Sequence, residues 1–352
     1  MRTYKIASIP GDGIGPEVIT VGRTVGDLIA AKFGFAIQWD EHDWSCERYL
    51  KTGRMMPEDG IEMLKQNDAI YLGAVGWPTV PDHVSLWGLL LPIRRELNQY
   101  VNFRPVRLLK GIASPLANRT SRDIDFVVIR ENVEGEYSDI GGRIYEGTPE
   151  ETVIQSGVFT RKGTDRVIRY AFELASTRSR KKVTSATKSN GIKHAMPFWD
   201  ERFAAVAKDY PDVSSDQFHI DILTAHFVRN PDWFDVVVGS NLFGDILSDL
   251  GPAIAGSIGI APSANINPSG DCPSMFEPVH GSAPDIAGKG VANPLAAVWT
   301  LSIMLDHLGE REAAAEVERA IERTLESGVK TRDLGGVART IDVQQALQTA
   351  LN

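Results

Sequence analysis

Two carboxylates stand four residues apart in a run that is otherwise apolar. Asp245 and Asp249 belong to residues 241–250, which read NLFGDILSDL. In a helix, residues i and i+4 project from one face, so both carboxylates would point the same way among apolar neighbours. Two adjacent anions in such surroundings raise each other's pKa or require a cation, and a hard divalent ion, Mg²⁺ or Mn²⁺, takes oxygen ligands. The alternative is that one aspartate caps a helix while the other is solvated. Asp221, in an expected strand at residues 219–223, offers a third carboxylate.

Arginines form a second group of residues that could carry chemistry. Arg94 and Arg95 end the run LLPIRR, Arg104 lies in NFRP, and Arg130 follows a strand-like run. A guanidinium fork binds a carboxylate through two parallel hydrogen bonds, so several converging arginines suit a dicarboxylic acid. An isolated arginine is more often solvated at the surface, and the spacing alone leaves both interpretations open.

Residues 11–17 (GDGIGPE) follow the first strand-like run and open a helix, as a dinucleotide-binding loop would. The G-x-G-x-x-G pattern needs a third glycine where this chain has Pro16, and Asp12 would face a pyrophosphate with like charge. The segment therefore predicts a tight structural turn, with a ligand role as the alternative, and a Rossmann fold is not supported.

Residues 277–286 (EPVHGSAPDI), followed by Asn293 and Pro294, are rich in glycine and proline. This composition predicts a long surface loop. Loops of such length in a compact domain are often functional, so the segment is a second candidate for ligand binding.

Four short apolar runs predict the strands that position these groups. They are residues 67–76 (NDAIYLGAVG), 124–132 (IDFVVIREN), 182–190 (KVTSATKSN) and 234–241 (FDVVVGSN). Helical periods occur between them at Val167, Ile168, Ala171, Phe172 and Ala175, and near the end at Ala314, Val317, Ile321 and Leu325, before Gly328. The alternation predicts an α/β chain with a largely parallel sheet and with ligand groups beyond the carboxyl ends of its strands. Residues 137–155 lack a helical period and predict a β excursion suited to pairing with another subunit.

Composition narrows the partners. The chain has 352 residues, and its 37 Lys and Arg against 46 Asp and Glu give a net charge of -9, which disfavours nucleic acid as a partner. No run approaches the ~20 apolar residues of a spanning helix, and no signal-peptide pattern precedes the first strand, so we expect a cytoplasmic protein without a membrane partner. Cys46 and Cys272 lie far apart without metal-ligand spacing and are expected to be reduced thiols.

Taken together, GDGIGPE, SNLFGDILSD and EPVHGSAPDI resemble the motifs of the β-decarboxylating 2-hydroxyacid dehydrogenases, the isocitrate/isopropylmalate dehydrogenase family. The resemblance covers nearly the whole chain. It implies a two-domain α/β fold of the isopropylmalate dehydrogenase type, with a parallel or mixed sheet, that is not a Rossmann fold. The large domain would comprise residues 1–99 and 257–352. The central domain, residues 100–256, would carry the metal ligands, a β arm and the interface of a homodimer with shared active sites.

The resemblance also assigns roles to the candidate residues. It makes Arg94, Arg104 and Arg130 a clamp for substrate carboxylates. It makes Asp221, Asp245 and Asp249 the Mg²⁺ or Mn²⁺ ligands, with Asp221 supplied by the partner subunit. Tyr137 and Lys188 match the acid/base pair, and Lys188 too would come from the partner.

The loop after residue 276 matches the family's adenosine site, whose residues here are Glu277, His280, Gly281, Ser282, Ala283, Pro284, Asp285, Ile286 and Asn293. Relatives that use NADP carry Lys-Tyr where this chain has Asp285 and Ile286. An aspartate there can accept a hydrogen bond from the ribose 2′-hydroxyl and would repel a 2′-phosphate, so NAD is implied. K⁺ is retained as a candidate monovalent cofactor.

The segment before Arg94 bears on the choice of substrate. Isocitrate enzymes have Ser and Asn where this chain has Gly88 and Leu90, and isopropylmalate enzymes have Glu where it has Trp87. The indole could fill the volume of an isopropyl group, whereas Leu90 and Leu91 match the isopropylmalate enzymes. The segment looks most like the branch that oxidises D-malate to pyruvate and CO₂, or oxidises tartrate. The alternatives are a 3-isopropylmalate dehydrogenase with a Trp87 that only packs, and a catalytically silent binding module.

Overall fold

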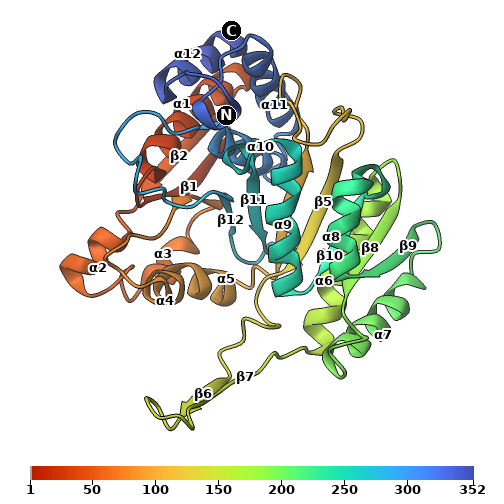
Figure 1. The fold of residues 1–352 in the computed structure, drawn as a ribbon. Coiled ribbons are helices and arrows are strands. Elements are labelled where there is room, and N and C mark those ends of the chain that lie inside the picture. The colour runs from red at the N-terminus through yellow and green to blue at the C-terminus, as the bar shows by residue number, and fades with distance from the viewer. Residues whose placement is uncertain (1) are drawn as a thin grey trace.

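The computed structural model describes residues 2–352 and contains a ten-stranded mixed sheet with helices on both faces (Figure 1). Its strands are β1 (Arg2–Gly11), β2 (Phe35–Glu41), β3 (Ala69–Ala74), β4 (Val101–Arg107), β5 (Asp125–Glu131), β8 (Lys182–Thr187), β9 (Ser214–His219), β10 (Val236–Gly239), β11 (Pro262–Ile266) and β12 (Ser274–Pro278). The strand order is β2-β1-β3-β12-β11-β4-β5-β10-β8-β9. The four strands expected from the sequence are β3, β5, β8 and β10, so those predictions are confirmed.

The sheet is parallel at both ends and antiparallel in the middle. The strands from β2 to β12 run parallel to one another, as do those from β5 to β9, whereas β12, β11, β4 and β5 pair antiparallel. Each parallel end, with its helices, forms one lobe of the molecule (Figure 1). One lobe therefore takes strands from both ends of the chain and the other from its middle. The domain boundaries at residues 99/100 and 256/257 stay a prediction.

The helices cover the two lobes. They are α1 (Gly15–Phe33), α2 (Cys46–Thr52), α3 (Gly60–Leu64), α4 (Asp82–Ser85), the π-helical turn η1 (Leu86–Leu90), α5 (Leu91–Glu96), α6 (Arg161–Thr177), α7 (Ala195–Ala207), α8 (Ile220–Arg229), α9 (Asn241–Ala255), α10 (Leu295–His307), α11 (Arg311–Glu326) and α12 (Thr340–Leu351), with three 3₁₀ turns at Pro231–Trp233, Ile258–Ile260 and Arg332–Leu334. The predicted helical periods lie in α6 and α11, whose apolar positions are buried. No helix within residues 2–352 is long and apolar enough to cross a membrane.

Helix α9 packs directly on β4 and β5, and two glycines permit this close approach. A Cβ added at Gly244 would lie 2.5 Å from Cβ of Arg130, and one at Gly251 would lie 2.4 Å from Cγ2 of Val106. Ser240 caps the helix by accepting a hydrogen bond from the Phe243 amide. The helix that carries Asp245 and Asp249 is thus pressed against the strands that carry the arginines.

The first glycine motif makes a turn that contacts protein backbone. Gly11 and Gly13 have positive φ angles of 73° and 61°, which favour glycine. A Cβ on Gly13 would lie 1.9 Å from the Ser282 carbonyl oxygen, which accepts a hydrogen bond from the Ile14 amide at 2.8 Å. The predicted structural turn is confirmed, and its glycines serve to hold the segment around Ser282.

Residues 137–155 form an arm that extends away from both lobes (Figure 1). The strands β6 (Gly141–Ile144) and β7 (Thr152–Gln155) pair antiparallel in it, so the predicted β excursion is confirmed. Ile144, Val153 and Ile154 are 54–60% exposed on this arm.

Two local predictions were wrong. Asp221 lies in the first turn of α8, not in a strand, because β9 ends at His219 and the apolar positions that follow have a helical spacing, with Leu223 and Phe227 buried. Glu277 lies in β12, not in a loop, because that strand is buried on both sides between β3 and β11.

Candidate active site

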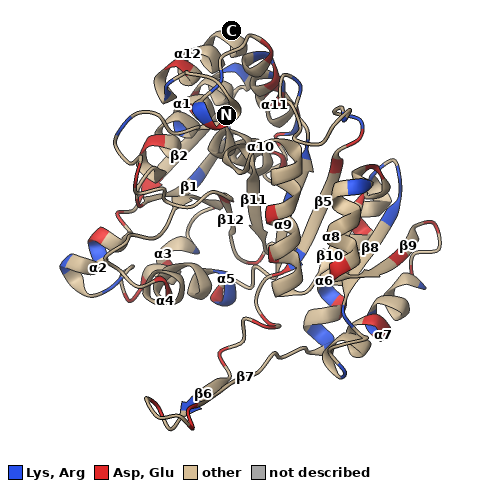
Figure 2. Ribbon diagram, viewed as in Figure 1, with Lys and Arg blue, Asp and Glu red and all other residues tan. Residues whose placement is uncertain are grey.

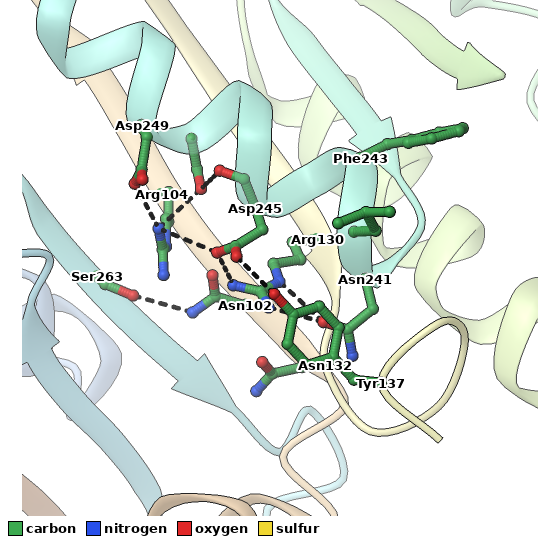
Figure 3. Close-up of polar contacts among 12 residues, drawn as sticks. Asn102, Arg104, Arg130, Asn132, Tyr137, Asn241, Phe243, Asp245, Asp249 and Ser263 are labelled. Atoms are coloured by element: carbon green, nitrogen blue, oxygen red, sulfur yellow. Dashed lines mark hydrogen bonds and ion pairs between the residues drawn. The ribbon is translucent and has the colours of Figure 1, made fainter. Parts of the chain in front are cut away.

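Three arginines from three different elements converge between the lobes. Arg94 comes from α5, Arg104 from β4 and Arg130 from β5, and they are 9%, 8% and 4% exposed. Arg104 and Arg130 both pair with Asp245, with Arg104 Nη1 3.9 Å from Asp245 Oδ1 (Figure 3). The convergence that the sequence left open is therefore present.

These guanidinium groups are incompletely neutralised. Burial lowers the pKa of Arg104, and it lowers the pKa of Arg130 to about 10 against the opposing pull of Asp245. The buried Nε atoms of Arg94 and Arg104 have no hydrogen-bond partner within residues 2–352. A buried cation with free donors favours an anionic ligand.

The two carboxylates of α9 lie beside this cluster. Asp249 Oδ1 is 3.5 Å from Arg104 Nη1, which also donates to Ser248 Oγ at 2.7 Å (Figure 3). Burial raises the pKa of Asp249, and the charge of Asp245 acts in the same direction. Both side chains keep exposed surface, 33% for Asp245 and 62% for Asp249. The predicted i, i+4 pair is present on one face of the helix.

Such a pair fits part of a magnesium or manganese site. Carboxylate oxygens are the hard donors that these ions take, and a divalent ion would offset both the burial and the charge of Asp245 that raise the pKa of Asp249. Within the described chain, however, no three Asp, Glu, His or Cys side chains gather as a metal site. A complete ligand set needs oxygen donors from elsewhere.

Tyr137 reaches this cluster from the segment after β5. Its hydroxyl donates to Asp245 Oδ2 at 2.9 Å, and the Arg130 guanidinium carbon lies 5.3 Å from its ring centroid (Figure 3). Burial, followed by the nearby charge of Asp245, raises its pKa. The phenol therefore holds its proton at neutral pH and can act as an acid.

Lys188 and Asp221 lie together but apart from the arginines. Lys188 Nζ is 2.7 Å from Asp221 Oδ1, and this lysine lowers the pKa of the carboxyl. No hydrogen bond or ion pair in the described part of the chain joins either residue to Arg94, Arg104 or Arg130. The described chain thus brings together Tyr137, Asp245, Asp249 and the arginines, whereas the Lys188–Asp221 pair forms a separate cluster.

Glu277 holds Arg94, and a buried network that sequence reasoning missed holds Glu277. Arg94 Nη2 donates to Glu277 Oε1 at 2.7 Å, and Asn265 Nδ2 donates to the same atom at 2.7 Å. Burial alone would raise the pKa of Glu277, but Arg94 and Asn265 lower it overall. Asn265 Oδ1 in turn accepts from Asn102 at 3.1 Å and from Asn132 at 2.9 Å.

A signal for this network was present in the sequence. Asparagine is depleted in strands, yet Asn102 and Asn265 stand inside strands with apolar neighbours. A buried side-chain amide requires polar partners nearby. Each of these asparagines therefore indicated a polar side chain on a neighbouring strand.

The segment before Arg94 borders the cluster. Leu90 and Leu91 are 8% and 7% exposed. Trp87 is 38% exposed, its ring lies 4.7 Å from the Arg95 guanidinium carbon, and it borders a cavity of ≈ 370 Å³ that Tyr49 and Met55 also line. Its contact with substrate stays a prediction.

The predicted adenosine residues lie on the loop after β12, apart from Glu277. The buried Nε2 atom of His280 lacks a hydrogen-bond partner among the described residues, whereas Nδ1 is 3.0 Å from the Gly281 carbonyl oxygen. An orphaned ring nitrogen on the loop that also carries the exposed Asp285 fits a polar ligand such as a nucleoside. The loop also carries Gly281, Ser282, Ala283, Pro284 and Ile286, and Asn293 follows it.

Comparison with known proteins agrees with this geometry. The chain is 58% identical to the D-malate dehydrogenase [decarboxylating] of Escherichia coli (strain K12), covering 99% of this chain and 98% of that protein. It is 57% identical to the tartrate dehydrogenase/decarboxylase of Pseudomonas putida, with the same coverage. The crystal structure of isocitrate dehydrogenase from Methylococcus capsulatus superposes with a TM-score of 0.88 at 36% identity, covering 99% of each chain.

The fold predicted from the motifs is therefore confirmed, including its mixed sheet. The isocitrate/isopropylmalate dehydrogenase family model matches residues 5–349, which is nearly the full length. From this match and the full-length identities, the chain belongs to the isocitrate/isopropylmalate dehydrogenase family.

Proposed function

We propose that this enzyme oxidises and decarboxylates D-malate to pyruvate and CO₂ with NAD and a divalent metal ion, and that it oxidises tartrate as a related substrate. The observation that carries the proposal is the buried set of Arg94, Arg104 and Arg130, two of which keep an Nε donor without a partner among the described residues, beside the two carboxylates of α9. Three such guanidinium groups suit the two carboxylates of a small dicarboxylic acid. The relatives from Escherichia coli and Pseudomonas putida are named for D-malate and tartrate.

The metal ligands in this proposal are Asp245 and Asp249 of one protomer and Asp221 of a second copy. A bound Mg²⁺ or Mn²⁺ would supply a Lewis acid that stabilises negative charge on the substrate oxygen during both steps. Arg94, Arg104 and Arg130 orient the substrate through its carboxylates.

Two residues exchange protons with the substrate. Lys188, supplied by the second copy, accepts the proton of the C2 hydroxyl as a neutral amine, after its ammonium group has released a proton to solvent. Before substrate binds, Asp221 at 2.7 Å orients that ammonium group. Bound NAD supplies the acceptor for the hydride that leaves C2. After CO₂ leaves, Tyr137 Oη delivers a proton to C3, which completes pyruvate.

The NAD assignment depends on Asp285. This exposed carboxylate can accept a hydrogen bond from a ribose 2′-hydroxyl and would repel a 2′-phosphate. The orphaned His280 ring nitrogen offers a further polar contact to the nucleoside.

The proposed shared site requires a homodimer. Ile222 and Val228 of α8 and Leu242 and Ile246 of α9 are 37–45% exposed, on two helices that pack together. This exposed apolar surface lies partly on the helix that carries Asp221, and the arm adds further exposed apolar residues. Such a surface suits burial against a second copy.

The second candidate is oxidation of 3-isopropylmalate, because the buried Leu90 and Leu91 would suit an alkyl group. Isocitrate is disfavoured. A Cβ at Gly88, where isocitrate enzymes carry Ser, would come within 2.8 Å of Met55 Cγ.

One panel of assays tests the proposal. NADH formation is measured with D-malate, tartrate, 3-isopropylmalate and isocitrate, with Mn²⁺ or with a chelator, and the panel is repeated with NADP. We expect D-malate with NAD and Mn²⁺ to give the highest kcat/KM. A wide margin in favour of 3-isopropylmalate would refute the D-malate assignment and the Trp87 argument, and no turnover with any substrate would favour a silent binding module.

A further inference from the structure

Arg95 joins the two sides of the candidate site. It follows Arg94 on α5, and neighbouring residues on a helix point in different directions. Arg94 is directed into the buried cluster, whereas the half-buried Arg95 donates from Nη2 to the carbonyl oxygen of Tyr137 at 3.0 Å. Helix α5 ends at Glu96, whereas β5 ends at Glu131, so this hydrogen bond joins residues that are far apart in the sequence.

The segment that carries Tyr137 is held on both sides by its own neighbours. Glu131 accepts hydrogen bonds from the Val133 and Glu134 amides, and the Ser138 carbonyl accepts one from Gln155 at 2.6 Å. Tyr137 itself has two polar contacts in the described chain, its hydroxyl to Asp245 and its carbonyl from Arg95. The preceding residues are held as well, since Glu136 accepts hydrogen bonds from Ser240 and Leu242 and Gly135 pairs with Val158. Within the described chain, Arg95 is the side chain that bonds the backbone of Tyr137 itself.

Trp87 limits the freedom of Arg95. Its ring lies 4.7 Å from the guanidinium carbon, within the range of a cation–π contact. An arginine side chain has many rotamers in solution, and a stacked guanidinium loses little further freedom when it donates. The indole thus holds the guanidinium ready for the Tyr137 carbonyl.

We infer that Arg95, supported by Trp87, is a positioning residue for Tyr137 and controls the second half of the reaction. This inference rests on the proposed function. In the step concerned, the O–H bond of Tyr137 breaks and its proton goes to C3. The electron pair left on C3 when CO₂ departed forms the new C–H bond, and solvent returns a proton to the phenolate. A shift of the Tyr137 backbone moves the donor away from C3 and slows this step, while hydride transfer from C2 is affected less.

The test separates the two halves of the reaction with Arg95→Ala. Rapid mixing with D-malate, NAD and Mn²⁺ measures the first turnover of NADH, and the steady state measures kcat. We expect first-turnover NADH formation within about twofold of the unmodified enzyme and a kcat about tenfold lower, which produces a burst. Because CO₂ has left before Tyr137 acts, the formation of pyruvate in its keto form should lag behind NADH formation. Equal slowing of both phases would overturn the inference.

Two further variants and a control define the mechanism. Arg95→Lys keeps the charge and should recover part of kcat. In the Arg95→Ala background, adding Trp87→Leu should not lower the ratio of kcat to the burst rate any further. Arg119→Ala is the matched control, because Arg119 also donates to a backbone carbonyl, that of Arg229 at 2.6 Å, in another part of the molecule. It should show no burst.

A readout independent of turnover tests the contact itself. The chain has eight tyrosines, so the ¹⁹F NMR spectrum of the 3-fluorotyrosine-labelled protein has few signals, and Tyr137→Phe identifies that of Tyr137. Arg95→Ala should shift this signal, whereas Arg119→Ala should not. An unmoved signal would overturn the inference. If the unmodified enzyme formed no NADH from D-malate, the proposed function would fail while the spectrum still decided whether Arg95 positions Tyr137.

Discussion

The two faces of β4 and β5 carry arginines in opposite electrostatic states. On the face covered by α9, Arg104 and Arg130 are buried, the Nε atom of Arg104 lacks a partner among the described residues, and burial lowers the pKa of both. On the opposite face, Arg107 of β4 and Arg178, which follows α6 and bonds Asp125 of β5, border a cavity of ≈ 340 Å³ that α10 and α11 also line. Arg107 pairs with Glu318 and Glu322 at 2.8 and 3.3 Å.

Arg178 shows the contrast most clearly. Burial alone would lower its pKa, but hydrogen bonds to Asp235 and Asp125 raise it overall. Basic residues are interspersed with acidic ones over both lobes, and α5 carries a basic segment at the candidate site (Figure 2). The difference teaches that arginine count does not identify an anion site. Desolvation without full pairing does, because only such a guanidinium gains from an added carboxylate.

Among the variants that test this comparison, Asp245→Asn should lose the most activity. We expect metal-dependent turnover to fall about 10³-fold or more, because the amide loses the charge that a divalent ion requires. NADH formation against Mn²⁺ concentration measures it. Glu318→Gln, on the opposite face, is the control and should keep its activity. Full activity of the Asp245 variant at low Mn²⁺ would sink the metal assignment.

The next test exchanges arginine for lysine on each face. Arg130→Lys should lower kcat/KM for D-malate by about 10²-fold to 10³-fold, because lysine keeps the charge but loses the two-pronged donor. Arg107→Lys should change kcat/KM by less than twofold. Similar losses in both variants would remove the functional distinction between the two faces.

The free energy of unfolding should depend more on Arg178 than on Arg104, which is the reverse of the order expected for activity. Arg178→Met leaves Asp235, whose side chain is 1% exposed, without its partner, and should lower the free energy of unfolding by about 3 to 5 kcal/mol. Arg104→Met removes a poorly compensated buried charge and should leave stability unchanged or raised, while activity is lost. Urea denaturation measures both. A larger loss of stability for Arg104→Met would contradict the comparison.

The smallest effect is expected at Glu131, whose neighbour Arg130 faces α9. Burial raises the pKa of Glu131 from 4.5 to about 7, so between these values the folded state retains a proton that the unfolded state releases. Stability from this residue is therefore present below pH 4.5 and decreases as the pH rises through 7. The total is on the order of 3 kcal/mol.

Glu131→Gln should abolish that decrease, since an amide does not titrate in this range. The free energy of unfolding is measured for both proteins from pH 5 to pH 8. We expect the difference between them to change with pH in favour of the variant. Parallel curves would show that Glu131 does not titrate in this window.

Much of the local structure could be predicted from the sequence. The apolar runs identified β3, β5, β8 and β10, and the four-residue spacing placed Asp245 and Asp249 on one helical face. The wrong predictions concerned the choice between strand, helix and loop over short segments. Asp221 fell in a helix because a strand and a helix meet at His219, and short apolar runs fit either period.

The sequence by itself determined the periodicities, the tight turn at Gly11 and Gly13, and the motifs that identify the family, because these depend on neighbouring residues and on backbone geometry. Only the tertiary structure decided that Arg94, Arg104 and Arg130 converge, that Asn265 holds Glu277, and that Arg95 reaches Tyr137. Those contacts join segments far apart in the chain. They exist because β4, β5 and β11 lie side by side in the sheet and Gly244 lets α9 approach it, and no local pattern encodes that pairing.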